Sequence, residues 1–139
     1  IRVMKTRNLI QELYFNVDPY VFYTALLTKK EHELFTGSEA NISDALNTEF
    51  SAYSNYIKGR NVLLDPGKLI VQEWRAVEEH WPDYHYSTVQ FKLKKLDNGT
   101  HLTFIHKGIP ELYFESISNG WNDYYWEPLK KYFQGLAPQ

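Results

Sequence analysis

The sequence contains no cysteine, which excludes a disulfide framework, a zinc–thiolate site and a thiol nucleophile. It also has no apolar run of the ~18 residues that a membrane-spanning helix needs. The N-terminal residues include Arg2, Lys5 and Arg7, but no apolar stretch long enough for a signal peptide follows them. These absences predict a cytoplasmic protein with no membrane partner.

An excess of positive charge is missing too. Seventeen acidic side chains stand against fifteen basic ones, which gives a formal net charge of -2 at pH 7. No global positive field is therefore available to attract phosphate groups, so we expect no nucleic-acid partner. The length of 139 residues is typical of one domain.

Aromatic residues are what the chain has in excess. They make up 17% of it, with eleven Tyr, eight Phe and four Trp. Rings in this number either fill a core or line a cavity.

The first third of the chain reads as one strand and two short helices. Apolar residues of one parity predict a strand over 8–17. Asp18 and Pro19 then suit the N-cap and first position of a helix over 19–27. Thr28 to Glu31 resembles a capping box for a second short helix, which ends near Phe35 before Gly37.

The middle of the chain reads as an antiparallel meander. Period-two patterns predict strands at 39–43, 47–53, 56–65, 68–77, 85–96 and 100–107. Short turns separate them, and such turns join antiparallel neighbours.

The hairpin around Asn98-Gly99 predicts which side chains share a face. A two-residue loop at these positions pairs Asp97 with Thr100. One face then carries an apolar set, and the other carries mostly lysine and polar residues. We expect the apolar set to be buried: Val89, Phe91, Leu93, Leu102, Phe104 and His106.

The last segment, 111–134, has the pattern of a mostly buried helix. Its apolar stripe consists of Phe114, Ile117, Trp121, Tyr124, Tyr125 and Tyr132. Pro128 cannot donate to the carbonyl of Tyr124, which predicts a kink or a restart. Gly135 and Pro138 are expected to end the helix, whose packed part should run from 116 to 133.

Several motifs together carry a family resemblance. They are Phe15-Asn16-Val17-Asp18-Pro19, Phe35-Thr36-Gly37, Ile70-Val71-Gln72-Glu73-Trp74-Arg75, Trp81-Pro82, Gly108-Ile109-Pro110 and Gly120-Trp121 with Tyr124-Tyr125-Trp126 and Pro128-Leu129. With the element order, they resemble the domain named after the activator of the ninety-kilodalton heat-shock protein ATPase, in the START-like (SRPBCC) superfamily. The resemblance covers roughly residues 9–133. One departure is Asp44-Ala45-Leu46-Asn47, where that family commonly has a glycine pair.

The resemblance implies an α+β helix-grip fold, in which a curved antiparallel sheet wraps around a long C-terminal helix. We accordingly expect residues 9–139 to form one helix-grip domain, and residues 1–8 to be a flexible N-terminus or an added remnant. The family's eukaryotic activator carries much of its ATPase stimulation on a separate N-terminal domain, to which nothing here corresponds. This domain alone should therefore stimulate a chaperone weakly or not at all.

No motif supports catalysis. The sequence has no phosphate loop, G-x-S-x-G elbow or H-E-x-x-H motif, and Glu78-Glu79-His80 reads as a solvated loop. We therefore predict a non-enzymatic protein with no cofactor and no metal site. His85 and His106 lie on the inward parity of the last hairpin, where a titratable ring needs a partner.

Two hypotheses of function remain open. The first is a domain that binds a small hydrophobic molecule between sheet and helix, with Trp74, Phe91, Phe104, His106, Trp121, Tyr124 and Tyr125 as ligand-binding residues. Gly59, expected opposite Trp74, would leave room for the indole. The second is a protein-interaction domain with a filled interior, a co-chaperone of the heat-shock chaperone. Cavity volume separates them, because a sterol-sized ligand needs about 300 Å³ or more.

Overall fold

A six-stranded antiparallel sheet organises the computed structural model, which describes residues 4–136. The strands are β1 (Thr6–Phe15), β2 (Glu49–Ala52), β3 (Ile57–Asp65), β4 (Leu69–Ala76), β5 (Ser87–Leu96) and β6 (Gly99–Pro110). Their spatial order is β1-β6-β5-β4-β3-β2. The predicted meander is confirmed from β2 to β6, and β1 pairs with the last strand to complete the sheet.

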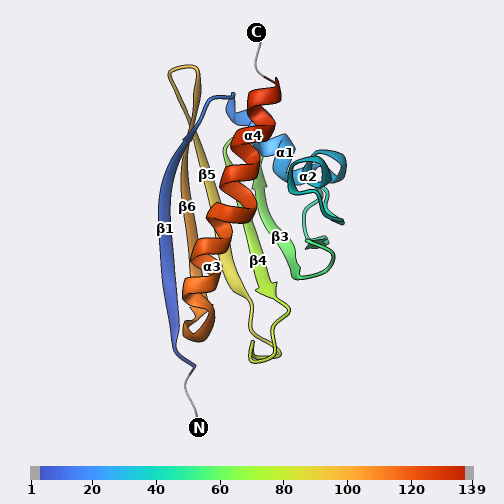
Figure 1. Cartoon of the computed structure of the whole chain (residues 1–139), viewed down its shortest axis with the longest axis vertical. Helices are drawn as coiled ribbons and strands as arrows, with labels where there is room; N and C mark the ends of the chain where they lie inside the picture. The colour runs from blue at the N-terminus through green and yellow to red at the C-terminus, as the bar shows by residue number, and fades with distance from the viewer. Residues whose placement is uncertain (1–3, 137–139) are drawn as a thin grey trace.

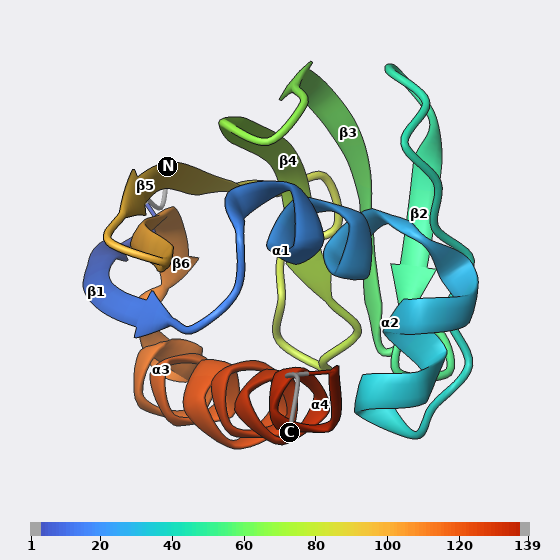
Figure 2. The same cartoon turned by 90° about the horizontal axis from the view of Figure 1, so that it is seen from above.

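Helices cover one face of this sheet. Helix α1 (Pro19–Leu27) and helix α2 (Lys29–Thr36) follow β1. The C-terminal helix comprises a 3₁₀ turn (Glu111–Tyr113), α3 (Phe114–Trp121), a π-helical segment (Asn122–Trp126) and α4 (Glu127–Leu136). Figure 1 shows this helix lying along the sheet, and Figure 2 shows the sheet arching around the space that the helices fill. The fold is the predicted α+β helix-grip fold.

The start of the chain differs slightly from the prediction. Strand β1 begins at Thr6, so residues 6–8 belong to the sheet rather than to a flexible N-terminus: Thr6 and Arg7 pair with β6, and Asn8 lies at a bulge. Residues 1–3 lie outside the described part. Asp18 caps α1 as expected, since its carboxylate accepts a hydrogen bond from the Tyr20 amide at 3.1 Å.

The predicted capping box of α2 is wrong. The Thr28 side chain makes no capping hydrogen bond, and the Glu31 carboxylate instead accepts a bond from the Tyr132 hydroxyl at 2.7 Å. This contact ties α2 to α4, so a tertiary partner has taken the side chain that the local motif needed. Gly37 ends α2 with φ of 71°, as predicted.

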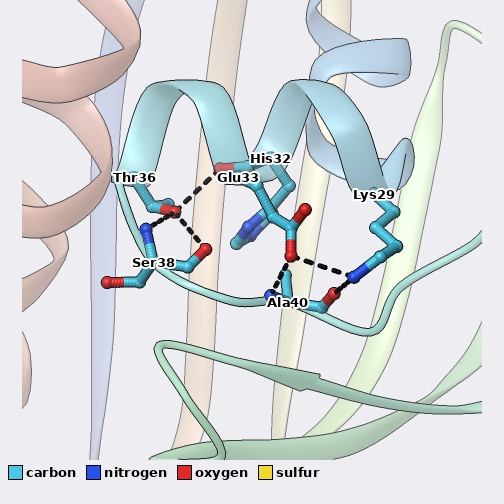
Figure 3. A network of polar contacts seen from close by, with 6 residues as sticks. All are labelled: Lys29, His32, Glu33, Thr36, Ser38 and Ala40. Carbon is cyan, nitrogen blue, oxygen red and sulfur yellow. Dashed lines mark hydrogen bonds and ion pairs between the residues drawn. The ribbon is translucent and has the colours of Figure 1, made fainter.

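Residues 39–43 form a loop and not the predicted strand. Only Asn41 makes a bridge, to Ser51. Figure 3 shows the reason: the Glu33 carboxylate accepts from the Ala40 amide at 3.0 Å, and the Lys29 ammonium donates to the Ala40 carbonyl at 2.7 Å. Side chains of α2 therefore satisfy backbone groups that a strand would have offered to a neighbour.

The β5–β6 hairpin has the predicted faces but a shifted register. Leu93 pairs with Leu102, and Phe91 pairs with Phe104, because the loop consists of Asp97 and Asn98. Asp97 takes φ of 54°. Gly99 is needed in the strand instead, since a Cβ there would overlap the carbonyl of Phe15 and the ring of Tyr14 on β1. A two-residue shift preserves parity, so the apolar set is buried as predicted.

Gly59 does pair with Trp74, but the space above it belongs to another ring. A Cβ at Gly59 would lie 2.7 Å from Cε2 of Phe50 and would overlap the carbonyl of Glu73. The predicted role, room for the Trp74 indole, is therefore wrong. The turn between β3 and β4 is one residue longer than predicted, because Asp65 pairs with Leu69. A bulge between Asn61 and Leu63 offsets this extra residue, so that Gly59 still pairs with Trp74.

The C-terminal helix departs from α geometry where the proline predicted it. The π-helical segment directly precedes Glu127 and Pro128. Because Pro128 has no N–H, the carbonyl of Tyr124 lacks its ordinary α-helical donor, and the Tyr53 hydroxyl donates to it. The helix continues past Gly135 to Leu136, and Pro138 lies outside the described residues. None of the described helices is both long and apolar enough to cross a lipid bilayer.

Replacing Gly59 with alanine should destabilise the sheet by at least about 2 kcal/mol, because the new methyl group meets a backbone carbonyl and a buried ring. Urea denaturation measures the change. Gly135→Ala is the matched control: nothing lies within 4 Å of its added Cβ, and its stability should be unchanged or slightly higher. Equal stability of the two variants would contradict the packing described for Phe50.

Candidate functional site

An open pocket of about 340 Å³ lies between the C-terminal helix and the strands β3 and β4. Most of its lining is aromatic. The residues are Tyr53, Tyr56, Ile57, Trp74, Ser116, Ile117, Gly120, Trp121, Tyr124 and Tyr125. Aromatic walls with a few polar groups are typical of small-molecule sites, and the volume lies at the lower end of their range. It exceeds the criterion of about 300 Å³, so volume alone does not decide against a ligand.

Two backbone features create the opening. Gly120 contributes no side chain, and a Cβ there would meet only Tyr124 at 3.7 Å, which is ordinary contact. Tyr53 and Tyr56 of the opposite wall are carried by a turn in which Tyr53, Ser54 and Asn55 take φ of 50°, 54° and 73°. Consecutive left-handed residues other than glycine cost energy and are commoner at functional sites than elsewhere.

Hydroxyl groups of the pocket tyrosines bond within the protein. The Tyr53 hydroxyl donates to the Tyr124 carbonyl, and the Tyr56 hydroxyl donates to Glu78 at 3.1 Å. The Tyr125 hydroxyl bonds Nε2 of His32 at 3.1 Å. Burial raises the pKa of Tyr53 and Tyr125, and burial with the Glu78 contact raises the pKa of Tyr56 to about 12. The lining is therefore uncharged at neutral pH.

His106 lies behind the pocket in a closed chain of hydrogen bonds. The Trp121 indole donates to Nδ1 of His106 at 3.0 Å. The proton of the neutral ring is therefore on Nε2, which donates to the Ser87 hydroxyl at 2.7 Å. Ser87 in turn donates to the Trp74 carbonyl at 2.9 Å. Both ring nitrogens are occupied, so His106 is a satisfied core residue and not the polar anchor that the ligand hypothesis needed.

The buried surroundings keep both core histidines neutral. Burial lowers the pKa of His106 to about 3 and that of His32 to about 4. His32 Nδ1 has no hydrogen-bond partner among the described residues. Protonation of either ring would leave a charge in an apolar environment.

The structure brings some of the predicted ligand-binding residues together. Trp74, Trp121, Tyr124 and Tyr125 line the pocket. Tyr124 is 59% exposed, so it forms the rim and not part of the buried stripe. Phe91, Phe104 and His106 do not line the pocket, because their rings pack against Trp121 in the closed core.

Other lining residues were missed by the sequence analysis. Ser116 and Gly120 precede the predicted Tyr124 by eight and four residues and so share its helix face, which is a signal that could have found them. Tyr53 and Tyr56 lie around the β2–β3 turn, beyond the strand ends where parity applies. Their position depends on the left-handed backbone, for which the sequence has no strong marker.

His85 has a structural role. Its Nε2 bonds the carbonyl of Gly108 at 2.6 Å, and its own carbonyl accepts from the Trp81 indole at 2.9 Å. Within residues 4–136, no three His, Cys, Asp or Glu side chains gather in a way that could hold a metal ion.

The fold and the pocket define a START-like helix-grip domain, and comparison with known proteins gives its family. The family model "Activator of Hsp90 ATPase homolog 1-like protein" matches residues 16–134. The chain belongs to this family. This agrees with the resemblance carried by the sequence motifs.

Individual relatives support the assignment. The human activator of 90 kDa heat shock protein ATPase homolog 1 is 28% identical over 119 residues, which are 86% of this chain and 35% of that protein. The crystal structure of an HSP90 activator from Plasmodium falciparum has a TM-score of 0.83 at 23% identity and covers 91% of this chain and 96% of that one. The Aha1 dimer of Colwellia psychrerythraea has a TM-score of 0.74 at 14% identity, with 87% and 92% covered. The chain spans only about a third of the length of the curated relatives it matches.

Stability should fall as the pH is lowered from 7 to 5. The unfolded chain takes up protons below about pH 6.5, whereas folded His106 and His32 stay neutral down to about pH 3 and 4. Each histidine therefore lowers the free energy of unfolding by about 2 kcal/mol as the pH falls from 6.5 to 5. Urea denaturation at several pH values measures the slope.

The exposed His80 supplies the control for this titration, because His80→Asn removes an imidazole that takes no part in the buried hydrogen bonds of His106 and His32. That variant should keep the slope, whereas His106→Gln should reduce it. A stability that is flat between pH 7 and 5 would show that neither buried ring stays neutral in the folded state.

Proposed function

We propose that this chain is a non-enzymatic protein-interaction domain that binds the ninety-kilodalton heat-shock chaperone. The family match over residues 16–134 carries the proposal. It is supported by the Plasmodium protein described as an HSP90 activator, since the same fold accounts for 96% of that chain. A cytoplasmic location is part of the proposal, because a protein without cysteine suits a reducing compartment.

The packing of the interior favours action through the surface. Phe91, Phe104, Trp121 and Trp126 contact one another at ring-centroid distances of 4.5 to 6.3 Å, and so fill the space between sheet and helix that a ligand enclosed there would need. His106 has no free ring nitrogen. The ring contacts and the hydrogen bonds of His106 hold the helix rigidly on the sheet. The side chains on the surface are therefore already ordered before a partner binds.

Binding without strong activation is the expected outcome with a cognate chaperone. Isothermal titration calorimetry should detect a saturable complex, whereas a coupled ATPase assay should show little or no stimulation by this domain alone. The control is the buried-core variant Trp121→Ala, which should lose about 3–5 kcal/mol of stability. If the chaperone recognises the folded domain, this variant should bind less well, whereas recognition of an unfolded chain would leave binding equal or stronger. Absence of a complex would contradict the proposal, and strong stimulation would contradict the expected weak activation.

A second candidate function rests on the open aromatic pocket. Its volume of about 340 Å³ suits a compact, mostly apolar molecule with one or two hydrogen-bonding groups, for which the Ser116 hydroxyl on the lining is a partner. Larger lipids fit it poorly, because the closed core around Phe104 blocks extension between the sheet and the helix.

Filling the pocket from the helix should abolish such binding. Gly120→Leu places a side chain into the open space, whereas Gly120→Ala adds only a methyl group and improves helix propensity by about 1 kcal/mol. Thermal unfolding with 2-naphthol as the probe should show stabilisation of the wild type and Gly120→Ala but not of Gly120→Leu. Equal shifts for all three would place the probe elsewhere and remove the support for a pocket ligand.

A further inference from the structure

The loop that joins β4 to β5, residues 77–86, extends past the ends of these two strands (Figure 1). It contains no regular secondary structure, and yet its backbone is bonded from several sides. Its Trp81 side chain is buried, stacks on Tyr113 and contacts Trp74. This ring anchors the loop in the core.

Hydrogen bonds hold both arms of the loop. The Arg75 guanidinium on β4 donates to the carbonyls of Pro82 and Asp83 at 3.2 and 2.6 Å. The Tyr113 hydroxyl accepts from the His80 amide at 3.1 Å. His85 joins the second arm to Gly108 on β6. Strands β4 and β6 and the 3₁₀ turn therefore fix the loop, which is unusual for a surface connection.

Tyr84 stands at the most exposed point of this rigid loop. It is 98% exposed, whereas the other large exposed apolar or aromatic side chains reach at most 70%. No hydrogen bond or ring contact to it is found within the described residues. The fixed backbone avoids the cost of ordering the loop on binding, and a tyrosine has only two χ angles to immobilise, so Tyr84 is suited to be an interaction hot spot.

The charges around Tyr84 limit the kind of partner. Asp83 precedes it, and Glu79, with a side chain 88% exposed, lies in the same loop. The Arg75 guanidinium is engaged with loop carbonyls and with the face of Tyr86 at 5.7 Å. Two carboxylates thus accompany the exposed ring, and the only partner of Glu79 among the described residues is the exposed His80 at 4.0 Å. A complementary surface has an apolar cleft edged by lysine or arginine.

We infer that Tyr84 is the anchor through which this domain docks on the chaperone, inserting its ring into an apolar cleft edged by basic side chains. The inference rests on the proposed function. It adds to that proposal the contact surface and the chemistry of the surface that receives it. The rigid loop positions the ring, and Asp83 and Glu79 steer it.

The test measures chaperone affinity by calorimetry for Tyr84→Ala, Tyr84→Phe and Leu34→Ala. Tyr84→Ala should weaken binding at least about 30-fold, the loss typical of a hot spot. Tyr84→Phe should bind within several-fold of the wild type, because the ring is kept. Leu34→Ala, which removes an exposed apolar side chain from α2, should bind as the wild type does. Thermal unfolding should be unchanged in all three.

The outcomes separate the inference from the proposed function. If the wild type does not bind the chaperone, both are overturned. If the wild type and Tyr84→Ala bind equally, only the docking inference is overturned. A Tyr84→Phe variant as weak as Tyr84→Ala would overturn the apolar cleft, since the hydroxyl and not the ring would then carry affinity. Glu79→Lys should slow association and reduce its dependence on salt, and an unchanged rate would overturn the basic edge.

Discussion

The hydrogen bond from the Trp121 indole to His106 fixes how the C-terminal helix lies on the sheet. Trp121 comes from α3 and His106 from β6. The series of hydrogen bonds continues from His106 to Ser87 on β5 and from there to the carbonyl of Trp74 on β4. A buried polar group without a partner is costly, so sliding the helix along the sheet would break several bonds at once. One polar chain thus defines a position that apolar packing alone would leave loosely specified.

This arrangement decides where open space remains. Because Trp121 is held over His106 and packs on Phe104 and Trp126, the centre of the grip is filled by rings. The aromatic pocket opens at the edge of the helix, between Gly120, which has no side chain, and the β2–β3 turn, whose Tyr53 bonds the Tyr124 carbonyl. The same rigidity extends outward, since Trp74 contacts Trp81, which anchors the loop that carries Tyr84. Filled interior and fixed surface are therefore two consequences of one packing arrangement.

Much of the fold could be predicted because it depends on local chemistry. Asp18-Pro19 defined the start of α1, period-two patterns defined the strands from β3 to β6, and Pro128 marked the irregular helix. Inner and outer faces depend only on parity, so they were predicted correctly although the hairpin register was not. The candidate site was predicted less well. Phe91, Phe104 and His106 were correctly expected inside, but parity does not distinguish a ring that closes a core from one that borders a cavity.

The sequence by itself determined the element order, the buried face and the family, since these follow from the spacing of residue types and from contiguous motifs. Tertiary structure decided which competing partner each polar group takes. Glu31 bonds Tyr132 and not its own helix end. Gly99 leaves room for β1 instead of forming the turn, and the backbone of Ala40 bonds side chains of α2 instead of pairing in a strand. In each case two arrangements satisfy the local chemistry, and the one that also buries the neighbouring element prevails. That choice depends on contacts between residues far apart in the chain, which local patterns do not contain.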